Sequence, residues 1–150
     1  MISVIRTSSE NIDFENLVNQ LNSYLKIIDG DDHAFYNQYN NIDVLKNVII
    51  VYVNEKASGC GAFKVFDKNT VEIKRMYTCP ESREKGVASK ALNALENWAR
   101  ELGYRNIILE TGKRQVEAVN FYKKMNYTLI ANFGPYKGVE NSLCFKKELI

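Results

Sequence analysis

A chain of 150 residues that is 45% hydrophobic and 25% charged is long enough to bury a full core, and its composition is typical of one globular domain spanning 1–150. Its formal net charge of +2 is too small to indicate nucleic-acid binding, and no apolar run approaches the roughly 18 residues that cross a membrane. The three cysteines lack metal-ligand spacing and suit a reducing compartment, and the first residues lack a signal-peptide pattern, so we expect a cytoplasmic protein with no metal.

The first half of the chain predicts a helix and then a three-strand meander. After a short strand over 1–7, Ser8 or Ser9 could cap a helix whose apolar residues recur with the helical period. The residues of that period are Phe14, Leu17, Val18, Leu21, Leu25 and Ile28. A polar break at 29–33 and a short aromatic helix at 34–39 precede strands at 48–53, 59–66 and 71–78, of which the first is apolar enough to be buried on both faces.

The second half predicts two helices and three more strands. A long amphipathic helix begins near Val87 and stops at Gly103, and a second helix runs from 115 to 125. Strands are expected at 106–111, 127–130 and 139–145. This order of elements indicates an α/β (α+β) domain with a mixed sheet covered by helices.

The turn that leads from the strand at 71–78 into the long helix has the features of a phosphate-binding site. A helix N-terminus attracts anions through its unpaired N–H groups and the positive end of its dipole. Gly86 and the small Ala88 would let an anion approach the backbone, and Arg83 and Lys85 add positive charge. We interpret 83–89 as a diphosphate cradle, and the alternative is an ordinary surface helix start.

Two motifs in this half of the chain have a characteristic spacing. The motif Arg/Gln-x-x-Gly-x-Gly/Ala is matched by Arg83, Gly86 and Ala88. The motif Ala-x-x-(aromatic)-Tyr-x-Lys-x-Gly-(aromatic) is largely matched by Ala118, Phe121, Tyr122, Lys124 and Tyr127. With these motifs and its order of elements, the chain resembles the GNAT superfamily of acyl-CoA-dependent N-acetyltransferases. It departs from many members at Glu84 (glycine), Gln115 (asparagine) and Asn126 (glycine), and the last change is compatible with a helix-ending turn because asparagine tolerates positive φ.

The resemblance implies a GNAT-type fold, with a twisted, mixed and mostly antiparallel sheet of about six to seven strands and helices on both faces. It also implies direct transfer of an acetyl group from acetyl-CoA to a primary amine of a small molecule or peptide in a ternary complex. The residues expected to hold acetyl-CoA are Met76, Tyr77, Thr78, Arg83, Glu84, Lys85, Gly86, Val87, Ala88, Ser89, Gln115 and Lys124. The alternative is a non-catalytic acyl-CoA sensor; in either case we expect a monomer or homodimer without nucleic-acid or membrane partners.

Two residues are candidates for moving protons. Tyr122 matches the family's general-acid position, although on its helix it could also be a core tyrosine. Glu72 is the candidate base, because a carboxylate in a central strand is costly unless it is paired or functional. An ion pair with Lys74 or with a residue of a neighbouring strand is the alternative role for Glu72, and Glu110 or water could be the base instead. Strict alternation would place Glu72, Lys74, Met76 and Thr78 on one face of their strand.

The acceptor is expected to be a cationic primary amine bound between the segment 29–39 and the loop 133–137. Asp29, Asp31 and Asp32 could attract the cation, with Tyr36 and Tyr39 as walls, and the loop could present Phe133 and Tyr136. The alternative is that the acidic segment is a polar turn in which Asp32 caps a short helix. His33, the single histidine, has no neighbours in sequence that would give it a role.

Overall fold

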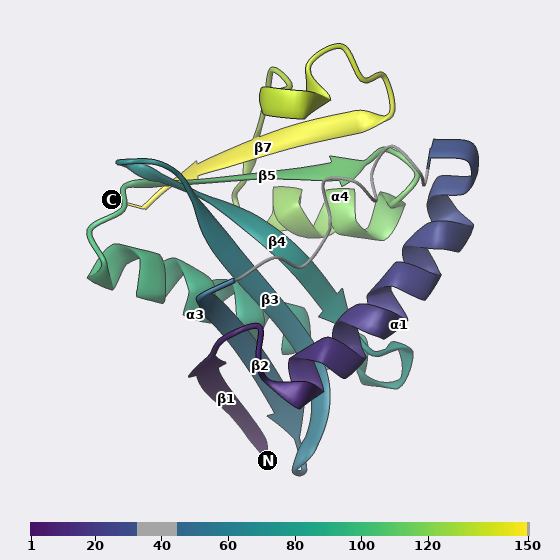
Figure 1. The fold of residues 1–150 in the computed structure, drawn as a ribbon, viewed down its shortest axis with the longest axis vertical. Coiled ribbons are helices and arrows are strands. Elements are labelled where there is room, and N and C mark those ends of the chain that lie inside the picture. The colour runs from purple at the N-terminus through teal and green to yellow at the C-terminus, as the bar shows by residue number, and fades with distance from the viewer. Residues whose placement is uncertain (33–44, 150) are drawn as a thin grey trace.

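The computed structural model describes residues 1–32 and 45–149, which form one sheet with helices packed against it (Figure 1). In chain order the helices and strands are β1 (Ile2–Thr7), α1 (Ile12–Asp29), β2 (Asn47–Val53), β3 (Lys56–Asp67), β4 (Thr70–Thr78), α3 (Val87–Glu101), β5 (Asn106–Gly112), α4 (Val116–Lys124), β6 (Thr128–Ile130) and β7 (Ser142–Glu148). The helix expected at 34–39 lies outside the described residues. None of the helices in these two ranges is long and apolar enough to cross a membrane.

The sheet has seven strands in the order β1-β2-β3-β4-β5-β7-β6. Every neighbouring pair is antiparallel except β4 and β5, which are parallel. This confirms the predicted mixed, mostly antiparallel sheet, with the number of strands at the upper end of the expected range.

Helices cover both faces of the sheet, as predicted. On one face, α1 packs Phe14, Leu17 and Val18 against alternate residues of β2 and β3. On the other face, α3 and α4 share a larger apolar cluster that includes Leu92, Leu95 and other buried side chains of the sheet. Figure 1 shows α1 and α3 on opposite sides of the same strands. Because β2 contributes to both clusters, it is buried on both faces, as its apolar sequence indicated.

The two parallel strands in the middle of the sheet stay together for only a short distance. Register pairs join β4 to β5 only from Thr70–Asn106 to Glu72–Ile108. Beyond Glu72 the strands diverge, and Figure 1 shows them splayed toward their carboxyl ends. In the part of the chain that the structure describes, no strand pairs with this side of β4 from Lys74 onward. The carboxyl half of β4 therefore has an open backbone edge inside the sheet.

A bulge in β4 breaks the predicted alternation of its side chains. The register with β3 shifts between Cys60 and Ala62, and Arg75 has φ 60, in the left-handed region. As a result Arg75 reaches Asn22 on α1, while Met76 packs into the cluster on the α3 face. The prediction that Glu72, Lys74, Met76 and Thr78 share one face is therefore wrong beyond Lys74, because the bulge inserts one extra residue.

The ends of two other elements differ from the sequence prediction. Helix α1 is capped by Asn11, whose Oδ1 accepts hydrogen bonds from the backbone N–H groups of Asp13 and Phe14. Ser9 instead accepts a hydrogen bond from the N–H of Leu45, so neither predicted serine caps the helix. Strand β7 begins three residues later than expected, because Val139 takes part in a hydrogen-bonded turn before it.

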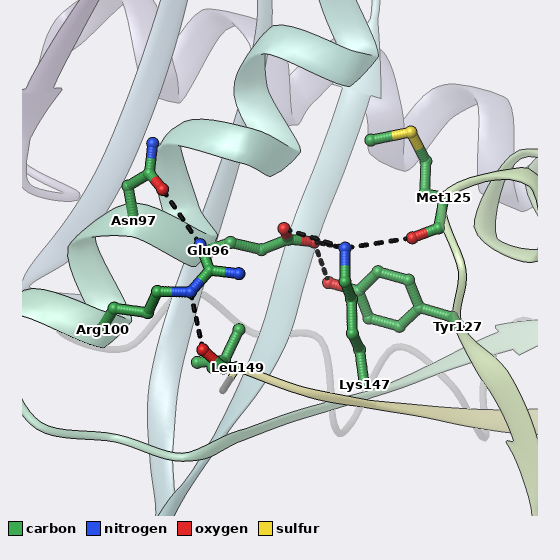
Figure 2. Close-up of polar contacts among 7 residues, drawn as sticks. All are labelled: Glu96, Asn97, Arg100, Met125, Tyr127, Lys147 and Leu149. Carbon is green, nitrogen blue, oxygen red and sulfur yellow. Dashed lines mark hydrogen bonds and ion pairs between the residues drawn. The ribbon is translucent and has the colours of Figure 1, made fainter.

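A buried polar network connects α3 to β7, the last strand in the chain (Figure 2). Glu96, which is 3% exposed, accepts a hydrogen bond of 2.8 Å from the hydroxyl of Tyr127. Lys147 Nζ lies 3.1 and 3.2 Å from the two oxygens of the same carboxylate. One turn further along α3, Arg100 donates to the carbonyl of Leu149 at 2.8 Å. The network satisfies a carboxylate that would be costly to bury alone.

Candidate active site

The divergence of β4 and β5 opens a cavity of about 100 Å³. It is walled by the two strands, by α1 on one side and α4 on the other, and by the turn that contains Tyr136. Of the residues predicted from sequence, the cavity brings together Glu72, Met76, Gln115, Tyr122 and Tyr136. It also contains Glu110, the alternative base.

The predicted cradle has a backbone that only certain residues adopt without strain. Gly86 has φ 79 and occupies the N-cap position of α3. A Cβ on Gly86 would meet no atom within 4 Å, so in this structure the backbone conformation, not crowding, is what favours glycine. Glu84 has φ 65, which accounts for the glycine that many family members carry there. Asn126 has φ 72 in the turn that ends α4, as its tolerance of positive φ predicted.

The N-terminus of α3 is available to an anion. No side chain makes a capping hydrogen bond to it, and its first turn contains no acidic residue. Arg83 and Lys85 are exposed just before it, and the guanidinium of Arg83 lies 5.7 Å from the ring centroid of Tyr24. These features fit a negatively charged group at the helix start.

The other residues expected to hold acetyl-CoA lie on β4, at the start of α3 and at the two ends of α4. Met76, Tyr77 and Thr78 form the open backbone edge of β4. Within the cradle, Val87 is buried, whereas Ala88 and Ser89 are half-buried. Gln115 lines the cavity just before α4, and Lys124 is exposed at the last turn of that helix.

Tyr122 is both packed in the core and exposed to the cavity. The side chain is 6% exposed and packs against the rings of Tyr127 and Phe145, so it belongs to the core. It also lines the cavity. Burial raises the pKa of its phenol well above the ordinary value, and the nearby charge of Glu110 raises it further. The phenol therefore keeps its proton at neutral pH and can donate it.

Glu72 lies in the cavity but is already paired. It is 5% exposed, and its carboxylate lies 3.1 Å from Lys74 Nζ and 4.0 Å from Lys64 Nζ. The ion pair considered from sequence is therefore formed, together with a cross-strand partner. The carboxylate of Glu72 therefore already serves two ammonium groups, and removing its charge would remove both ion pairs.

Glu110 has a carboxylate better suited to take a proton. Burial raises its pKa to about 7, with smaller increases from Asp29 and Glu72, while a hydrogen bond from Ser142 and the charge of Lys74 act in the opposite direction. Its Oε2 atom is buried and has no hydrogen-bond partner among the described residues. A carboxyl group that titrates near neutrality, with one oxygen unused, has the properties of a general base.

The predicted acceptor residues are only partly brought together. Tyr136 is 2% exposed and accepts a hydrogen bond from Lys74 Nζ at 3.2 Å. Asp31 and Asp32 do not line the cavity, and Asp32 forms a 3.3 Å ion pair with Arg114. Tyr36 lies outside the described residues, as do His33 and the rest of the segment up to 44. The acidic residue of this region that does line the cavity is Asp29.

Lys74 and Arg75 also line the cavity, and sequence reasoning assigned them no site role. The sequence did contain an indication for Arg75. Strict alternation would place its side chain on the same face of the strand as those of Val71, Ile73 and Tyr77. A cation in that position indicates either a functional site or a break in the alternation, and the structure shows the break. Within the described ranges, no cluster of three or more histidine, cysteine, aspartate or glutamate side chains is arranged to hold a metal ion.

Comparison with known proteins gives one family and one fold. Residues 14–127 match the model of the acetyltransferase (GNAT) family. The IAA acetyltransferase of Azospirillum brasilense is 33% identical over 92 residues, which are 61% of this chain and 60% of that protein. The chain thus spans less than two thirds of the length of this curated relative.

Solved structures share the fold over the whole chain. A Klebsiella pneumoniae protein assigned as an acyl-CoA N-acyltransferase superimposes with a TM-score of 0.83 at 24% identity, covering 100% of this chain and 99% of that one. A GNAT family acetyltransferase from Elizabethkingia anophelis, solved with acetyl-CoA bound, gives 0.68 at 15% identity over 98% and 97% of the two chains. Since the family model covers most of the sequence, including the cradle and both helices that flank the cavity, the chain belongs to the GNAT family of acetyltransferases.

Proposed function

We propose that the chain transfers an acetyl group from acetyl-CoA directly to a primary amine of a small molecule or peptide, with both substrates bound at once. The observation that carries this proposal is the pairing of Glu110 and Tyr122 in one cavity. One group has a pKa of about 7 and can accept a proton, and the other keeps its proton at neutral pH. Transfer of an acyl group from a thioester to an amine is accelerated by both a proton acceptor and a proton donor.

Acetyl-CoA would bind along the open edge of β4 and across the start of α3. The uncapped helix N-terminus at 86–89, with Arg83 and Lys85 beside it, supports a diphosphate site. The free backbone edge at 76–78 can hydrogen-bond an extended amide-containing arm as an added strand would. Gln115 and Lys124, before and at the end of α4, would contact the same molecule from the opposite side.

We assign the base role to Glu110 in preference to Glu72. The thioester supplies the acetyl carbon, so a C–N bond forms as the C–S bond breaks, and the amine must lose a proton. Glu110 can take that proton through its unused oxygen without losing an ion pair, whereas Glu72 is held by Lys74. The charge of Glu72 raises the pKa of Glu110, so Glu72 contributes to the base without being the base.

Tyr122 would donate a proton to the departing sulfur. The phenol lies in the cavity on α4, across from the strand that carries Glu110. Its position in the core keeps it in place, because its ring is packed against Tyr127 and Phe145. A rigidly held acid loses little entropy when the substrates bind.

The proposal is tested by measuring free thiol released from acetyl-CoA in the presence of a panel of primary amines. Thiol release that depends on an amine, with stoichiometric N-acetylated product by mass spectrometry, is expected. Binding of acetyl-CoA without turnover of any amine would support the non-catalytic sensor instead. A cytoplasmic location, a monomeric or homodimeric state and the absence of nucleic-acid or membrane partners stay predictions.

A further inference from the structure

Arg75 is a buried cation that none of the described carboxylates neutralises through an ion pair. Its side chain belongs to a residue that is 8% exposed, and Nη1 donates to Oδ1 of Asn22 at 2.9 Å. None of the ion pairs formed by the described residues includes Arg75. Burial lowers the pKa of the guanidinium only to about 10, so it is charged at neutral pH. A charge in this position is costly unless something compensates it.

The bulge of β4 directs this cation toward the acceptor side of the cavity. Asn22, its partner, lies on α1 between Leu21 and Leu25, and both leucines line the cavity. The guanidinium also lies near enough to Tyr136 for the two to influence each other electrostatically. Arg75 therefore faces the region between α1 and Tyr136, away from the α3 face on which the cradle is built.

The same cavity also carries negative charge. Asp29 and Glu110 line it, and the charge of Asp29 acts on Glu110. An ammonium group fits beside these carboxylates, and the base is there to deprotonate it. The cavity thus offers a place for a cation at β5 and a place for an anion at the bulge of β4.

We infer that the acceptor carries a carboxylate in addition to its primary amine, and that Arg75 binds this carboxylate. The inference rests on the proposed function, because it assigns chemistry to the acceptor of that reaction. Guanidinium matches a carboxylate through two parallel N–H donors, and Asn22 occupies only one terminal nitrogen. Lys74 cannot replace it, because its ammonium already serves Glu72 and Tyr136. The substrate class is therefore amino acids and related amines with a free carboxylate.

The competing explanation is that Arg75 only fastens α1 to the sheet through Asn22. If so, substituting Arg75 should lower the stability of the fold and should change kcat/KM by the same factor for every acceptor. If Arg75 binds a carboxylate, the substitution should lower kcat/KM more for acceptors that have a carboxylate than for acceptors that lack one. The two are separated by comparing matched acceptors rather than by total activity.

The test uses glycine, β-alanine and γ-aminobutyrate, each against its carboxamide, with the wild type and Arg75→Gln. A carboxylate also changes the basicity of the neighbouring amine, so the decisive quantity is how much the acid-to-amide ratio of kcat/KM changes on substitution. We expect Arg75→Gln to lower this ratio by about 10- to 100-fold for the best acceptor, as for loss of a charge-assisted hydrogen bond. The KM for acetyl-CoA should change little. Arg105→Gln, which removes an exposed positive charge at the far end of β5, is the control and should leave the ratio unchanged.

An acid-to-amide ratio that is the same in Arg75→Gln and the wild type overturns the inference while leaving the proposed function intact. If Arg75→Gln does not fold, as judged by circular dichroism, Arg75→Lys decides: it keeps the charge, loses the paired donors and must still lower the ratio. If no amine in the panel is acetylated, the proposed function fails. Calorimetric titration of the same acids and amides into the CoA-bound protein then decides the inference. Acids that bind the wild type but not the Arg75 variant support it. Equal affinities of the two proteins for the acids contradict it.

Discussion

Tyr122 on α4 and Glu110 on β5 face the same cavity, and the charge of Glu110 helps to raise the pKa of the Tyr122 phenol. The two groups are therefore electrostatically coupled before any substrate is present. Protonation of Glu110 would ease the deprotonation of Tyr122, which is the direction of change needed when the base has just received a proton and the acid must give one away.

Replacing Tyr122 with phenylalanine removes the proton donor and keeps the ring that packs in the core. We expect kcat to fall by roughly 10²- to 10⁴-fold, with little change in acetyl-CoA affinity. Tyr104→Phe, the same substitution at a half-buried tyrosine that packs on Phe63 at the other end of the sheet, should have wild-type kcat. Wild-type turnover by Tyr122→Phe under conditions where chemistry limits the rate would reduce the residue to packing.

The titration of Glu110 predicts how activity depends on pH. The base works only when ionised, and its pKa is about 7, so kcat/KM for the acceptor should rise as pH increases through 7 and then level off. Glu110→Gln should lower activity and abolish this limb of the profile. The measurement is kcat/KM from pH 5.5 to 9 with an acceptor whose amine titrates outside that range.

Glu72→Gln serves as the comparison for Glu110→Gln. It removes the ion pair with Lys74 and a negative charge that raises the pKa of Glu110. The rising limb of the pH profile should therefore persist and move to lower pH. Loss of the limb in Glu72→Gln and its persistence in Glu110→Gln would assign the base to Glu72.

The stability of the folded state should also respond to Glu110. Its carboxyl pKa is higher in the folded protein than the ordinary value of 4.5, so protonation favours the folded state. This contribution is fully present below the unfolded pKa and is lost as pH rises through about 7. Glu110→Gln, which cannot ionise, should therefore gain stability relative to the wild type as pH rises from about 4.5 to about 7. The check is the difference in Tm between the two proteins across that interval.

Glu84 occupies a backbone position that suits glycine better. The backbone of Glu84 is in the left-handed region, at φ 65. Glu84→Gly removes a side chain that disfavours this conformation, together with a negative charge beside the proposed diphosphate site. We expect acetyl-CoA to bind several-fold more tightly, by calorimetric titration. Glu55→Gly is the matched control, because Glu55 has φ 70 in the turn between β2 and β3. It should shift Tm in a similar way and leave the affinity unchanged; equal gains in affinity would contradict the diphosphate site.

The network in Figure 2 predicts a large loss of stability when only one partner is removed. Lys147→Met leaves the carboxylate of Glu96 buried with the Tyr127 hydroxyl as its main remaining partner. We expect a loss of about 3 kcal/mol in the free energy of unfolding. The double variant with Glu96→Gln should recover part of this loss, as measured by urea denaturation.

Much of the fold could be predicted from the sequence, because its helices and strands have regular apolar periods. The bulge at Arg75 could not, since a single residue in the left-handed region leaves no trace in that pattern. The start of β7 was misplaced because Val139 looks like a strand residue but is used in a turn. The cap of α1 was assigned to serines, although Asn11 stands nearer the first turn and caps equally well.

Residues of the candidate site that belong to a sequence motif could be named from the sequence, whereas the contacts between distant residues could not. Tyr122 and Gln115 do line the cavity, as the resemblance implied. The choice between Glu72 and Glu110 as the proposed base depends on which carboxylate forms an ion pair with Lys74, and the sequence alone does not show this. Asp32 faces Arg114, a partner 82 positions further along the chain, which no local pattern reveals.

The short contact between β4 and β5 has a consequence for amide hydrogen exchange. A strand in the middle of a sheet is normally among the slowest to exchange, because both of its edges are hydrogen-bonded. Here no strand formed by residues 1–32 or 45–149 lies beside the β5-facing amides from Lys74 to Thr78, so these amides should exchange with solvent as quickly as those of an outer strand. If an extended ligand occupies that edge, saturation with acetyl-CoA should slow exchange at these amides selectively, and a peptide covering β4 would report binding residue by residue.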